Sequence, residues 1–507
     1  MSMETRPRHL SRRSFGALFG AGLASALLPE RTFAELSPLA ALAGPPVWDE
    51  LLDDLHRRTF SFFWRATAPA KGLTPDAWPH PIFSSIAAIG FNLTALCIGA
   101  KSGYVTRAEA AQRTHATLEF LWSSPQGDAR RGISGDHGFF YHFLDLDSGL
   151  RFRDVELSTI DTTMLVLGAL TSAAFFDQDT PQEARIRKLG LDLYQRLDWD
   201  FFIRKSGMIS MGWHPEDAKA GHPEAGLIAR NWDRYNEGMM LLLLSLGREQ
   251  EPHHSDIWRR WSETLAPTFG PNFGEPHLGF SPLFGHQYSH CWFDFRDIAD
   301  PFMAARGLTY FENSRRAVYA QRRYAILNPG GFRDYGAEIW GLSASQGPGD
   351  FTADVAGRSV RFHGYAARGP QTGDGESIDD GTLAPTAGVA SIAFAPEIVV
   401  PLIHSLKARY GDDIYQEFGF LDAFNPSVPP GSRLESGRMT SRAGWVADQY
   451  LGIDQGPILI MLENHRSGFV WDLFCRSPLT GPIARRAFRR AGFQATGPGG
   501  HWLQEPS

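Results

Sequence analysis

The sequence predicts an all-α fold whose helices form two concentric shells. Helical segments that are apolar on every side alternate with segments that keep one polar face. A helix that is covered all round is apolar all round, whereas a surface helix retains a polar stripe. The connections are long and rich in Gly, Pro, Asp and aromatic residues, and long loops in a compact domain usually carry function. The pattern therefore predicts an inner and an outer layer of helices, with functional residues on the loops.

The hydrophobic pattern of the first half of the sequence predicts five helices. Leu51, Leu55 and Phe62 recur at helical spacing, and so do Ile86 and Leu93 in the next segment. The predicted ranges are 47–65, 84–101, 106–122, 158–175 and 181–197.

The same alternation continues to the C-terminus. Further helices are predicted over 233–247, 255–268, 314–327, 395–410, 455–467 and 482–491. The stretch 350–365 alternates in the manner of a small β-hairpin. No linker divides the chain, so we expect a single domain over residues 44–507.

Residues 1–43 are typical of an export signal followed by a short linker. Arg12 and Arg13 precede a weakly apolar run from Gly16 to Leu28, as in a twin-arginine signal. That run is too short to span a bilayer, and no other segment reaches about 18 apolar residues. We therefore expect a periplasmic or secreted protein without a membrane span.

Composition argues against several classes of function. The net charge of −7 offers no electrostatic footprint for nucleic acid. The three cysteines have no metal-ligand spacing, and no dinucleotide or Walker motif occurs, so we expect no cofactor. His286 and His290 are spaced like metal ligands on a helix, but the Gly and aromatic residues around them argue against a helix there. We expect no metal and a monomeric chain.

Two acidic residues flank the start of the helix predicted at 158–175. Ser158 and Asp161 resemble a capping box, so Asp161 is either a structural cap or a functional carboxylate. Glu156 lies just before the helix, where the helix dipole stabilises an anion. Glu156 therefore suits a base or nucleophile, and the alternative is a surface glutamate.

Glu237 is the last charged residue before the apolar run 239–244. A carboxyl group in partly apolar surroundings has a raised pKa, which a general acid requires. The alternative is an ion pair with Arg234 or Arg230. Gly238 beside it leaves room where a substrate approaches.

Glycoside hydrolysis needs two carboxylates across the scissile bond, and Glu237 with Glu156 or Asp161 meets that need. Aromatic and polar side chains on the loops would line such a site, because flat apolar rings suit sugars. Asp454 could instead be an N-cap residue of the helix that follows it. The candidate lining residues are Trp232, Tyr235, Phe284, His286, Gln287, Tyr288, Trp292, Trp340 and Asp454.

Several segments together resemble the glycoamylase-like domain of endo-β-1,2-glucanases (glycoside hydrolase family 144) and of cyclic β-1,2-glucan synthases. They are GHQYSHCWFDFRDIAD, AEIWGLSAS, DGTLAPTAGVASIAFAPE, GFLDAFN and YLGIDQGPILIMLENHRSGFVW, and the resemblance covers about residues 48–480. One departure is the acidic, Gly-rich insertion Gly373–Asp380, which would reshape one end of the cleft.

This resemblance implies an (α/α)6 toroid that acts on β-1,2-glucan and releases sophoro-oligosaccharides. It implies that Glu237 is the acid and that the segment Glu156–Asp161 supplies the opposite carboxylate. A transglycosylase acting at the same site and a non-catalytic glucan-binding protein are the alternatives.

Overall fold

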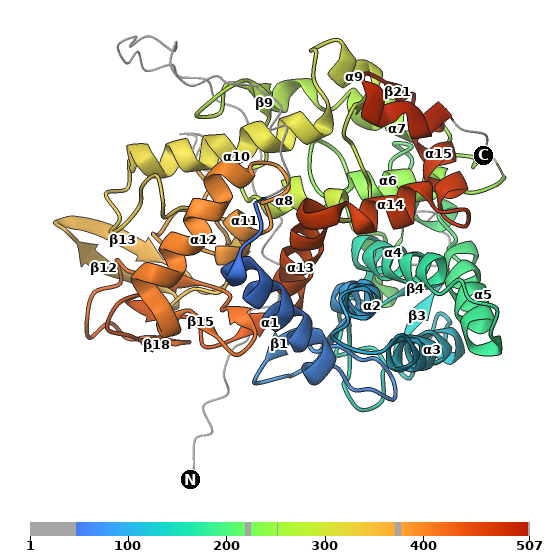
Figure 1. Ribbon diagram of the computed structural model, residues 1–507, viewed down its shortest axis with the longest axis horizontal. Helices are drawn as coiled ribbons and strands as arrows, with labels where there is room; N and C mark the ends of the chain where they lie inside the picture. The colour runs from blue at the N-terminus through green and yellow to red at the C-terminus, as the bar shows by residue number, and fades with distance from the viewer. Residues whose placement is uncertain (1–46, 218–224, 251, 371–376, 505–507) are drawn as a thin grey trace.

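The computed structural model describes residues 47–217, 225–250, 252–370 and 377–504. The predicted export signal at 1–43 lies outside these residues. Within them, no helix combines the length and the apolar character needed to cross a bilayer. The fold is mostly helical and forms an (α/α)6 toroid, as predicted (Figure 1).

The inner layer consists of helical segments buried along most of their length. In the helix Thr159–Phe175, for example, every residue from Thr159 to Ala174 is buried. These segments are α2 (Ile86–Lys101), α4 (Thr159–Phe175), α6 (Met239–Leu246), α8 (Phe284–Gln287) continued by a 3-10 turn (Tyr288–Cys291), α11 (Pro385–Val389) and α13 (Gly452–Ser467).

The outer layer consists of helices with one exposed face. In the helix Glu50–Ala66, for example, Leu52, Leu55 and Phe62 are buried, whereas Asp53 and Arg57 are exposed. The outer helices are α1 (Glu50–Ala66), α3 (Arg107–Ser123), α5 (Pro181–Gln195), α7 (Ile257–Ser262), α10 (Tyr310–Leu327) and α12 (Pro396–Tyr410). Inner and outer helices alternate along the chain, which confirms the predicted two shells.

Some boundaries differ from the prediction. The helix predicted at 233–247 begins at Met239, because the polar segment before it forms turns. The region of His286 and His290 is helical, contrary to the prediction from its glycines and aromatics. Burial of the whole segment outweighs the weak helix propensity of these residues. Helices that the periodicity did not resolve are α9 (Pro301–Ala304), α11 and α14 (Phe469–Arg476), whereas α15 (Gly481–Arg490) matches its prediction.

Glycines allow two inner helices to approach closely. A Cβ on Gly90 of α2 would lie 2.2 Å from the carbonyl oxygen of Met164 in α4. A Cβ on Gly168 of α4 would lie 2.1 Å from the carbonyl oxygen of Gly90. The contact is therefore backbone against backbone, and only glycine fits at either position.

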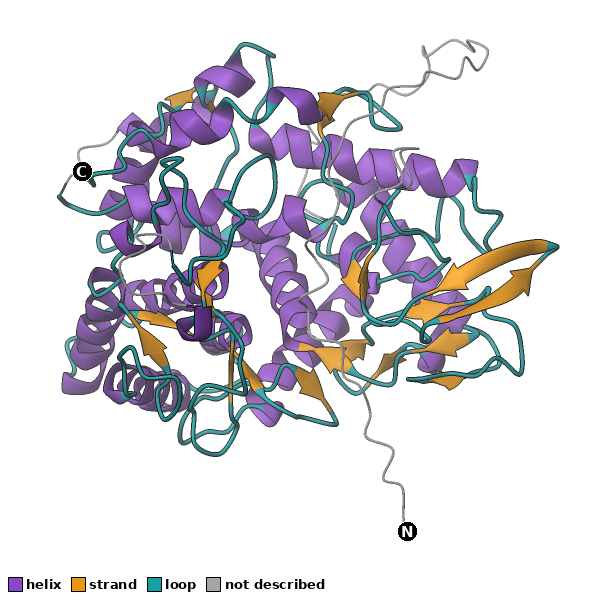
Figure 2. Cartoon of the chain, turned by 180° about the vertical axis from the view of Figure 1, so that it is seen from behind, coloured by secondary structure: helices purple, strands orange, loops and turns teal. Residues whose placement is uncertain are grey.

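The strands are short and lie in the connections between helices (Figure 2). The predicted hairpin is present as β12 (Phe351–Val355) and β13 (Arg358–Phe362), which project at the left edge of Figure 1. The other pairs are β3 (Gly135–Asp136) with β4 (Phe139–Phe140), β8 (Phe269–Gly270) with β9 (His277–Leu278), β10 (Ile298–Ala299) with β21 (Gln494–Ala495), β11 (Ala344–Ser345) with β14 (Ala366–Ala367), β15 (Tyr415–Gln416) with β16 (Gly419–Phe420), and β19 (Trp445–Val446) between β17 (Phe424–Asn425) and β18 (Arg438–Met439).

Three strand pairs anchor the end of the toroid at which inner helices begin. Strand β2 (Ser84–Ser85) precedes α2 and pairs with β5 (Phe143–Leu144). Strand β6 (Leu157–Ser158) precedes α4 and pairs with β7 (Gly212–Trp213), and β20 (Tyr450–Leu451) precedes α13 and pairs with β1 (Ala77–Trp78). This end of the inner shell is therefore held by backbone hydrogen bonds, and the candidate carboxylates lie there.

Candidate active site

Glu237 lies immediately before α6, on a backbone fixed by a neighbouring inner segment. Ser289 accepts a hydrogen bond from the Met240 N–H (3.1 Å) and donates one to the Glu237 carbonyl oxygen (3.0 Å). The side chain is half-buried, and its Oε2 has no hydrogen-bond partner among the described residues. Burial, with a smaller contribution from the nearby Asp161 charge, raises the pKa of Glu237 to about 7. A carboxyl group of this pKa carries a proton near neutral pH and can donate it.

Asp161 lies in the first turn of α4, close enough for its charge to act on Glu237. Ser158 caps this helix, because its Oγ accepts a hydrogen bond from the Asp161 N–H (3.2 Å). The same hydroxyl donates to Asp161 Oδ2 (2.6 Å). The cap residue is thus Ser158, and the Asp161 carboxylate is oriented by the cap.

Glu156 pairs with a histidine that the sequence analysis did not identify. The distance from Glu156 Oε1 to His142 Nδ1 is 2.7 Å. Burial alone would raise the pKa of Glu156, but the charge and hydrogen bond of His142 outweigh it and lower the pKa to about 2. The other ring nitrogen of His142 lies 3.4 Å from Asp161 Oδ2. One imidazole therefore links the two acidic residues of this segment.

A second acidic pair lies at the start of α13. Asp454 is buried in the first turn of this helix, where no side chain caps the helix, so Asp454 is not an N-cap residue. It interacts with Asp422, whose Oδ2 accepts a hydrogen bond from the Gln346 N–H (3.0 Å). Burial raises the pKa of Asp422 above its usual range, and the hydrogen bonds from Gln346 and Asp454 oppose it only in part. Two buried carboxyl groups in contact favour the sharing of one proton.

Trp232 holds the Glu237 segment against the start of α4. Its Nε1 donates to Thr159 Oγ1 (2.9 Å). A Cβ on Gly238 would lie 2.9 Å from the Trp232 ring and 2.8 Å from Asn236 Oδ1. Gly238 is thus required by packing within the protein, which differs from the space for substrate expected from the sequence.

Four other predicted lining residues make their contacts inside the wall of the toroid. The Tyr235 hydroxyl contacts Ser314 Oγ (3.3 Å), and the His286 Nε2 contacts the Phe280 carbonyl oxygen (3.2 Å). Gln287 donates to the Ala387 carbonyl (2.7 Å), and Trp292 donates to Thr94 Oγ1 (3.1 Å). These side chains join neighbouring helices, so the structure gives them a packing role.

The remaining predicted lining residues lie near the starts of inner helices. The Tyr288 hydroxyl donates to the Ile453 carbonyl oxygen (3.2 Å), and the Phe284 ring lies 5.3 Å from the Tyr288 ring. Trp340 is buried, and its Nε1 has no hydrogen-bond partner among the described residues. Its indole N–H is therefore a buried donor that the described residues leave unsatisfied.

The helical spacing of His286 and His290 does not create a metal site. His290 Nε2 contacts Ser314 Oγ (3.2 Å), and burial lowers the pKa of both imidazoles. No group of three or more His, Cys, Asp or Glu side chains in the described ranges is arranged to hold a metal ion.

The described part of the predicted insertion is anchored in the core. Asp380 forms a fully buried ion pair with Arg368 (2.8 Å). Asp379 accepts hydrogen bonds from the Tyr324 hydroxyl (2.8 Å) and the Tyr335 hydroxyl (2.9 Å). Residues 373–376 lie outside the described residues, so only the C-terminal part of this segment is placed.

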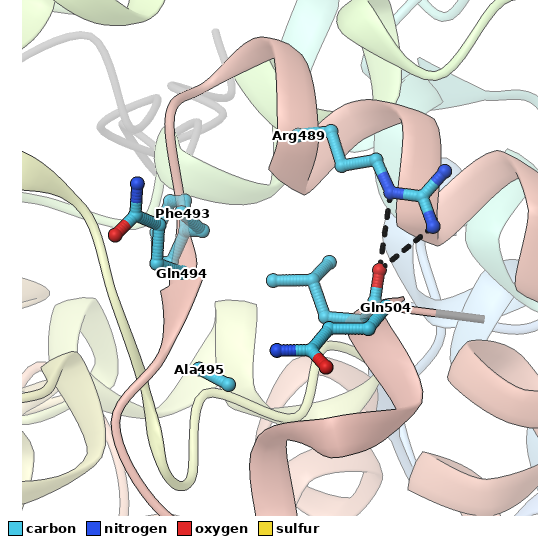
Figure 3. A pocket seen from close by; sticks show the side chains of 6 residues that line it. Arg489, Phe493, Gln494, Ala495 and Gln504 are labelled. Carbon is cyan, nitrogen blue, oxygen red and sulfur yellow. Dashed lines mark hydrogen bonds between the residues drawn. The ribbon is translucent and has the colours of Figure 1, made fainter.

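A hollow of about 570 Å³ lies away from these carboxylates, beside α15 (Figure 3). Arg489 faces it and donates to the Leu503 carbonyl oxygen (2.9 Å). The lining residues are Arg489, Phe493, Gln494, Ala495, Leu503 and Gln504. None of them is a carboxylate, so this hollow does not offer acid–base chemistry.

Sequence reasoning missed His142 and Asp422. His142 is a lone polar residue within the aromatic run Phe139-Phe140-Tyr141-His142-Phe143. A histidine in such a run must find polar partners when buried, and this was the available signal. Asp422 lies between β16 and β17 and carries no comparable signal.

Comparison with known proteins relates the chain to one family. The model of the family described as Glycoamylase, "Putative glucoamylase", matches residues 229–478. The exo β-1,2-glucooligosaccharide sophorohydrolase (non-reducing end) of Parabacteroides distasonis is 26% identical over 471 residues, which cover 87% of this chain and 58% of the relative. The chain thus spans less than two thirds of the length of that relative.

Solved structures share the fold over nearly the whole length. A protein from Bacteroides uniformis that carries the same glucoamylase description superposes with a TM-score of 0.72 at 27% identity, covering 88% of this chain and 98% of its own. An endo-β-1,2-glucanase from Chitinophaga pinensis, in complex with sophorotriose and glucose, gives a TM-score of 0.71 at 22% identity, with 88% and 98% covered. The resemblance of this chain to the glycoamylase-like family is therefore confirmed, by the family model over residues 229–478 and by the fold over most of the chain.

Proposed function

We propose that this protein is a glycoside hydrolase that cleaves β-1,2-linked glucan and releases sophoro-oligosaccharides. The observation that carries this proposal is Glu237, whose pKa is raised to about 7 beside the charged Asp161. A protonated carboxyl group opposite ionised ones is the arrangement that glycosidic cleavage requires. The β-1,2 linkage is supported by the names of the Parabacteroides and Chitinophaga proteins to which the chain is similar.

Glu237 is the general acid in this mechanism. Its proton passes to the glycosidic oxygen as the bond between that oxygen and the anomeric carbon breaks. Oε2 has no hydrogen-bond partner among the described residues, so no hydrogen bond to them has to be broken at this oxygen before the transfer. Burial supplies the raised pKa that keeps the proton available near neutral pH.

Glu156 and Asp161 are the candidates for the second carboxylate. Glu156 is ionised at all ordinary pH values, because its pKa is about 2. Asp161 interacts electrostatically with Glu237, because its charge contributes to the raised pKa of the acid. Either carboxylate could activate water or attack the anomeric carbon, and the separation from the acid decides between inversion and retention.

Aromatic and polar groups at the same end of the toroid would hold the sugar chain. Trp340 offers a buried indole N–H, and Phe284 and Tyr288 offer apolar ring surface near the start of α13. Asp454, in the first turn of that helix, offers a carboxyl oxygen for sugar hydroxyls.

The proposal includes export and a monomeric mature chain. The paired residues Arg12 and Arg13 before a short apolar run support a twin-arginine route to the periplasm or the medium. Residues 44–507 would then form the catalytic domain. Fractionation of cells that express the full chain, with Arg12 and Arg13 replaced by Lys as the control, tests the route.

The function is tested by incubating the protein with a panel of linkage-defined glucans. Linear β-1,2-glucan, β-1,3-glucan, β-1,4-glucan and starch are compared by reducing-end assay and thin-layer chromatography. We expect new reducing ends from β-1,2-glucan, in a ladder of sophoro-oligosaccharides, and little product from the other glucans.

Each alternative gives a different result. Redistribution of chain lengths without new reducing ends would replace hydrolysis by transglycosylation. Binding to β-1,2-glucan without any change in chain length would leave only a binding protein. Rapid release of glucose or maltose from starch would overturn the linkage.

A further inference from the structure

His142 is fixed by its backbone between the starts of two inner helices. Its N–H donates to the Glu156 carbonyl oxygen (2.9 Å), and its carbonyl accepts from the Ile86 N–H at the start of α2 (3.2 Å). The next residue, Phe143, pairs with Ser85 through β5 and β2. The Phe143 ring stacks on the imidazole at 4.0 Å. The position and plane of this ring are therefore set before any ligand arrives.

Both ring nitrogens of His142 face carboxylates. Nδ1 lies 2.7 Å from Glu156 Oε1 and is hydrogen-bonded to it, whereas Nε2 lies 3.4 Å from Asp161 Oδ2, an ion-pair distance without hydrogen-bond geometry. A neutral imidazole has one N–H and one lone pair, so it would turn a lone pair toward one of the two anions. An imidazolium has an N–H on each side and interacts favourably with both carboxylates.

We propose that His142 is a positioning residue that acts as a cation between the carboxylates of Glu156 and Asp161, beside the acid Glu237. This inference rests on the proposed function, because it assigns the cation to the same glycosidase site. Nothing in the geometry requires His142 to touch substrate, and its side chain is only 12% exposed.

The cation matters because three carboxyl groups would otherwise crowd one end of α4 and α6. Burial by itself favours the protonated form of Glu156, and His142 reverses that preference. Burial and, to a smaller extent, the charge of Asp161 favour the protonated form of Glu237. The cluster therefore combines an ionised Glu156 with a protonated Glu237, which separates the role of base or nucleophile from that of acid.

Other charged groups near this cluster act more weakly. His214 contributes to the ionised state of Glu156, but after His142 in size. Glu216, which lies 3.9 Å from His214, is already paired with the buried Arg151. Ser158 donates to Asp161 Oδ2 and supports the anion without adding charge. Removal of His142 thus removes the main counter-charge of the cluster.

The test uses two neutral replacements that keep part of the hydrogen bonding. His142→Asn retains an amide donor at the place of Nδ1, toward Glu156, and His142→Gln retains one at the place of Nε2, toward Asp161. In both variants we expect the acidic limb of the kcat/KM profile on β-1,2-glucan to move up by about one pH unit or more. A profile that falls uniformly, or does not change, would overturn the proposal.

A matched control is a buried histidine at a distant ion pair. His56 Nε2 lies 3.1 Å from Glu463 Oε2, and its Nδ1 contacts the Tyr104 hydroxyl (2.9 Å). His56→Gln disturbs packing and stability in a comparable way, but it changes no charge near Glu237. We expect it to leave the shape of the pH profile unchanged, which separates a charge effect from a folding defect.

A second measurement does not depend on the substrate. In the full chain labelled with ¹⁵N-histidine, nuclear magnetic resonance distinguishes a ring with two N–H groups from a neutral ring. We expect one doubly protonated ring at pH 7 that is missing from the His142→Asn spectrum. If the wild-type protein cleaves no glucan, the proposed function fails and this spectrum decides on His142 alone. A neutral His142 ring at pH 7 would refute the cation.

Discussion

Glu156 and Glu237 are the same residue type at the same end of the toroid, yet their surroundings drive them in opposite directions. Glu156 has a cationic neighbour 2.7 Å away, and its pKa falls to about 2. Glu237 has no partner for Oε2 among the described residues and has an anionic neighbour, and its pKa rises to about 7. Burial opposes ionisation of both carboxyl groups, so the neighbouring charge decides the difference.

The comparison shows how one fold obtains an acid and a base from two glutamates. Each inner helix begins at this end, and the residues just before α4 and α6 are carried on connections with different partners. The segment before α4 meets His142 through paired backbone, whereas the segment before α6 is held by Ser289 and Trp232 without a charge. Separation of pKa values between neighbouring carboxyl groups is what acid–base assignments rest on.

The largest expected effect is the loss of activity in Glu237→Gln. Glutamine keeps the size of the side chain but cannot supply the proton for the leaving oxygen. We expect kcat on β-1,2-glucan to fall by about 10²- to 10⁴-fold, the usual contribution of a general acid. Initial rates of reducing-end formation measure the loss.

Glu417→Gln is the control for this variant, because Glu417 is a surface residue paired with Arg65. It should keep the wild-type rate. Full activity of Glu237→Gln would show that Glu237 is not the general acid, and the two glutamates would then have no contrasting catalytic roles.

The second expected effect concerns stability, and the two glutamates should differ in sign. The folded pKa of Glu156 lies below the unfolded value of about 4.3, so its ionisation stabilises the fold above that pH, and the gain disappears as the pH falls toward 2. The folded pKa of Glu237 lies above the unfolded value, so its burial costs stability as the pH rises toward 7. At pH 8, Glu156→Gln should lose on the order of 2 kcal/mol, whereas Glu237→Gln should gain up to about that amount.

Thermal unfolding from pH 3 to pH 8 measures both changes. The deficit of Glu156→Gln should shrink below pH 4, and the gain of Glu237→Gln should vanish below pH 5. Destabilisation of both variants by equal amounts at every pH would mean that packing, and not charge, governs the two sites.

The helices were predictable because their apolar pattern depends on burial alone. Segments such as 84–101 and 158–175 are buried on every side, so their apolar composition predicts the inner shell. The helices α2 and α4 match these two segments closely. The region of His286 was misjudged because glycine and aromatic residues lower helix propensity, while the surrounding helices impose the helical conformation. Local propensity does not contain that information.

The candidate site was predictable only in part. The position of Glu237 before an apolar run predicted its raised pKa, because the apolar run indicates that the carboxyl group is buried. Its neighbours did not follow, since His142 and Asp161 are 19 residues apart and meet through short strands that no periodicity reveals. The contacts that Tyr235, Gln287 and Trp292 make between helices could not be predicted either. An aromatic or amide side chain near a loop can pack between helices or bind a ligand, and the sequence does not distinguish the two roles.

The smallest expected effect links the two glutamates through Asp161. Its charge raises the pKa of Glu237, so the neutral Asp161→Asn variant should lower that pKa. Because the acid must be protonated, kcat/KM falls as the pH rises through about 7 in the wild type, and in Asp161→Asn the fall should begin at a pH lower by up to about one unit. An unchanged basic limb would show that Asp161 does not act on the acid. A loss of about 10²-fold or more at every pH would instead assign Asp161 as the second carboxylate, and Glu156 would then serve only to hold His142 in place.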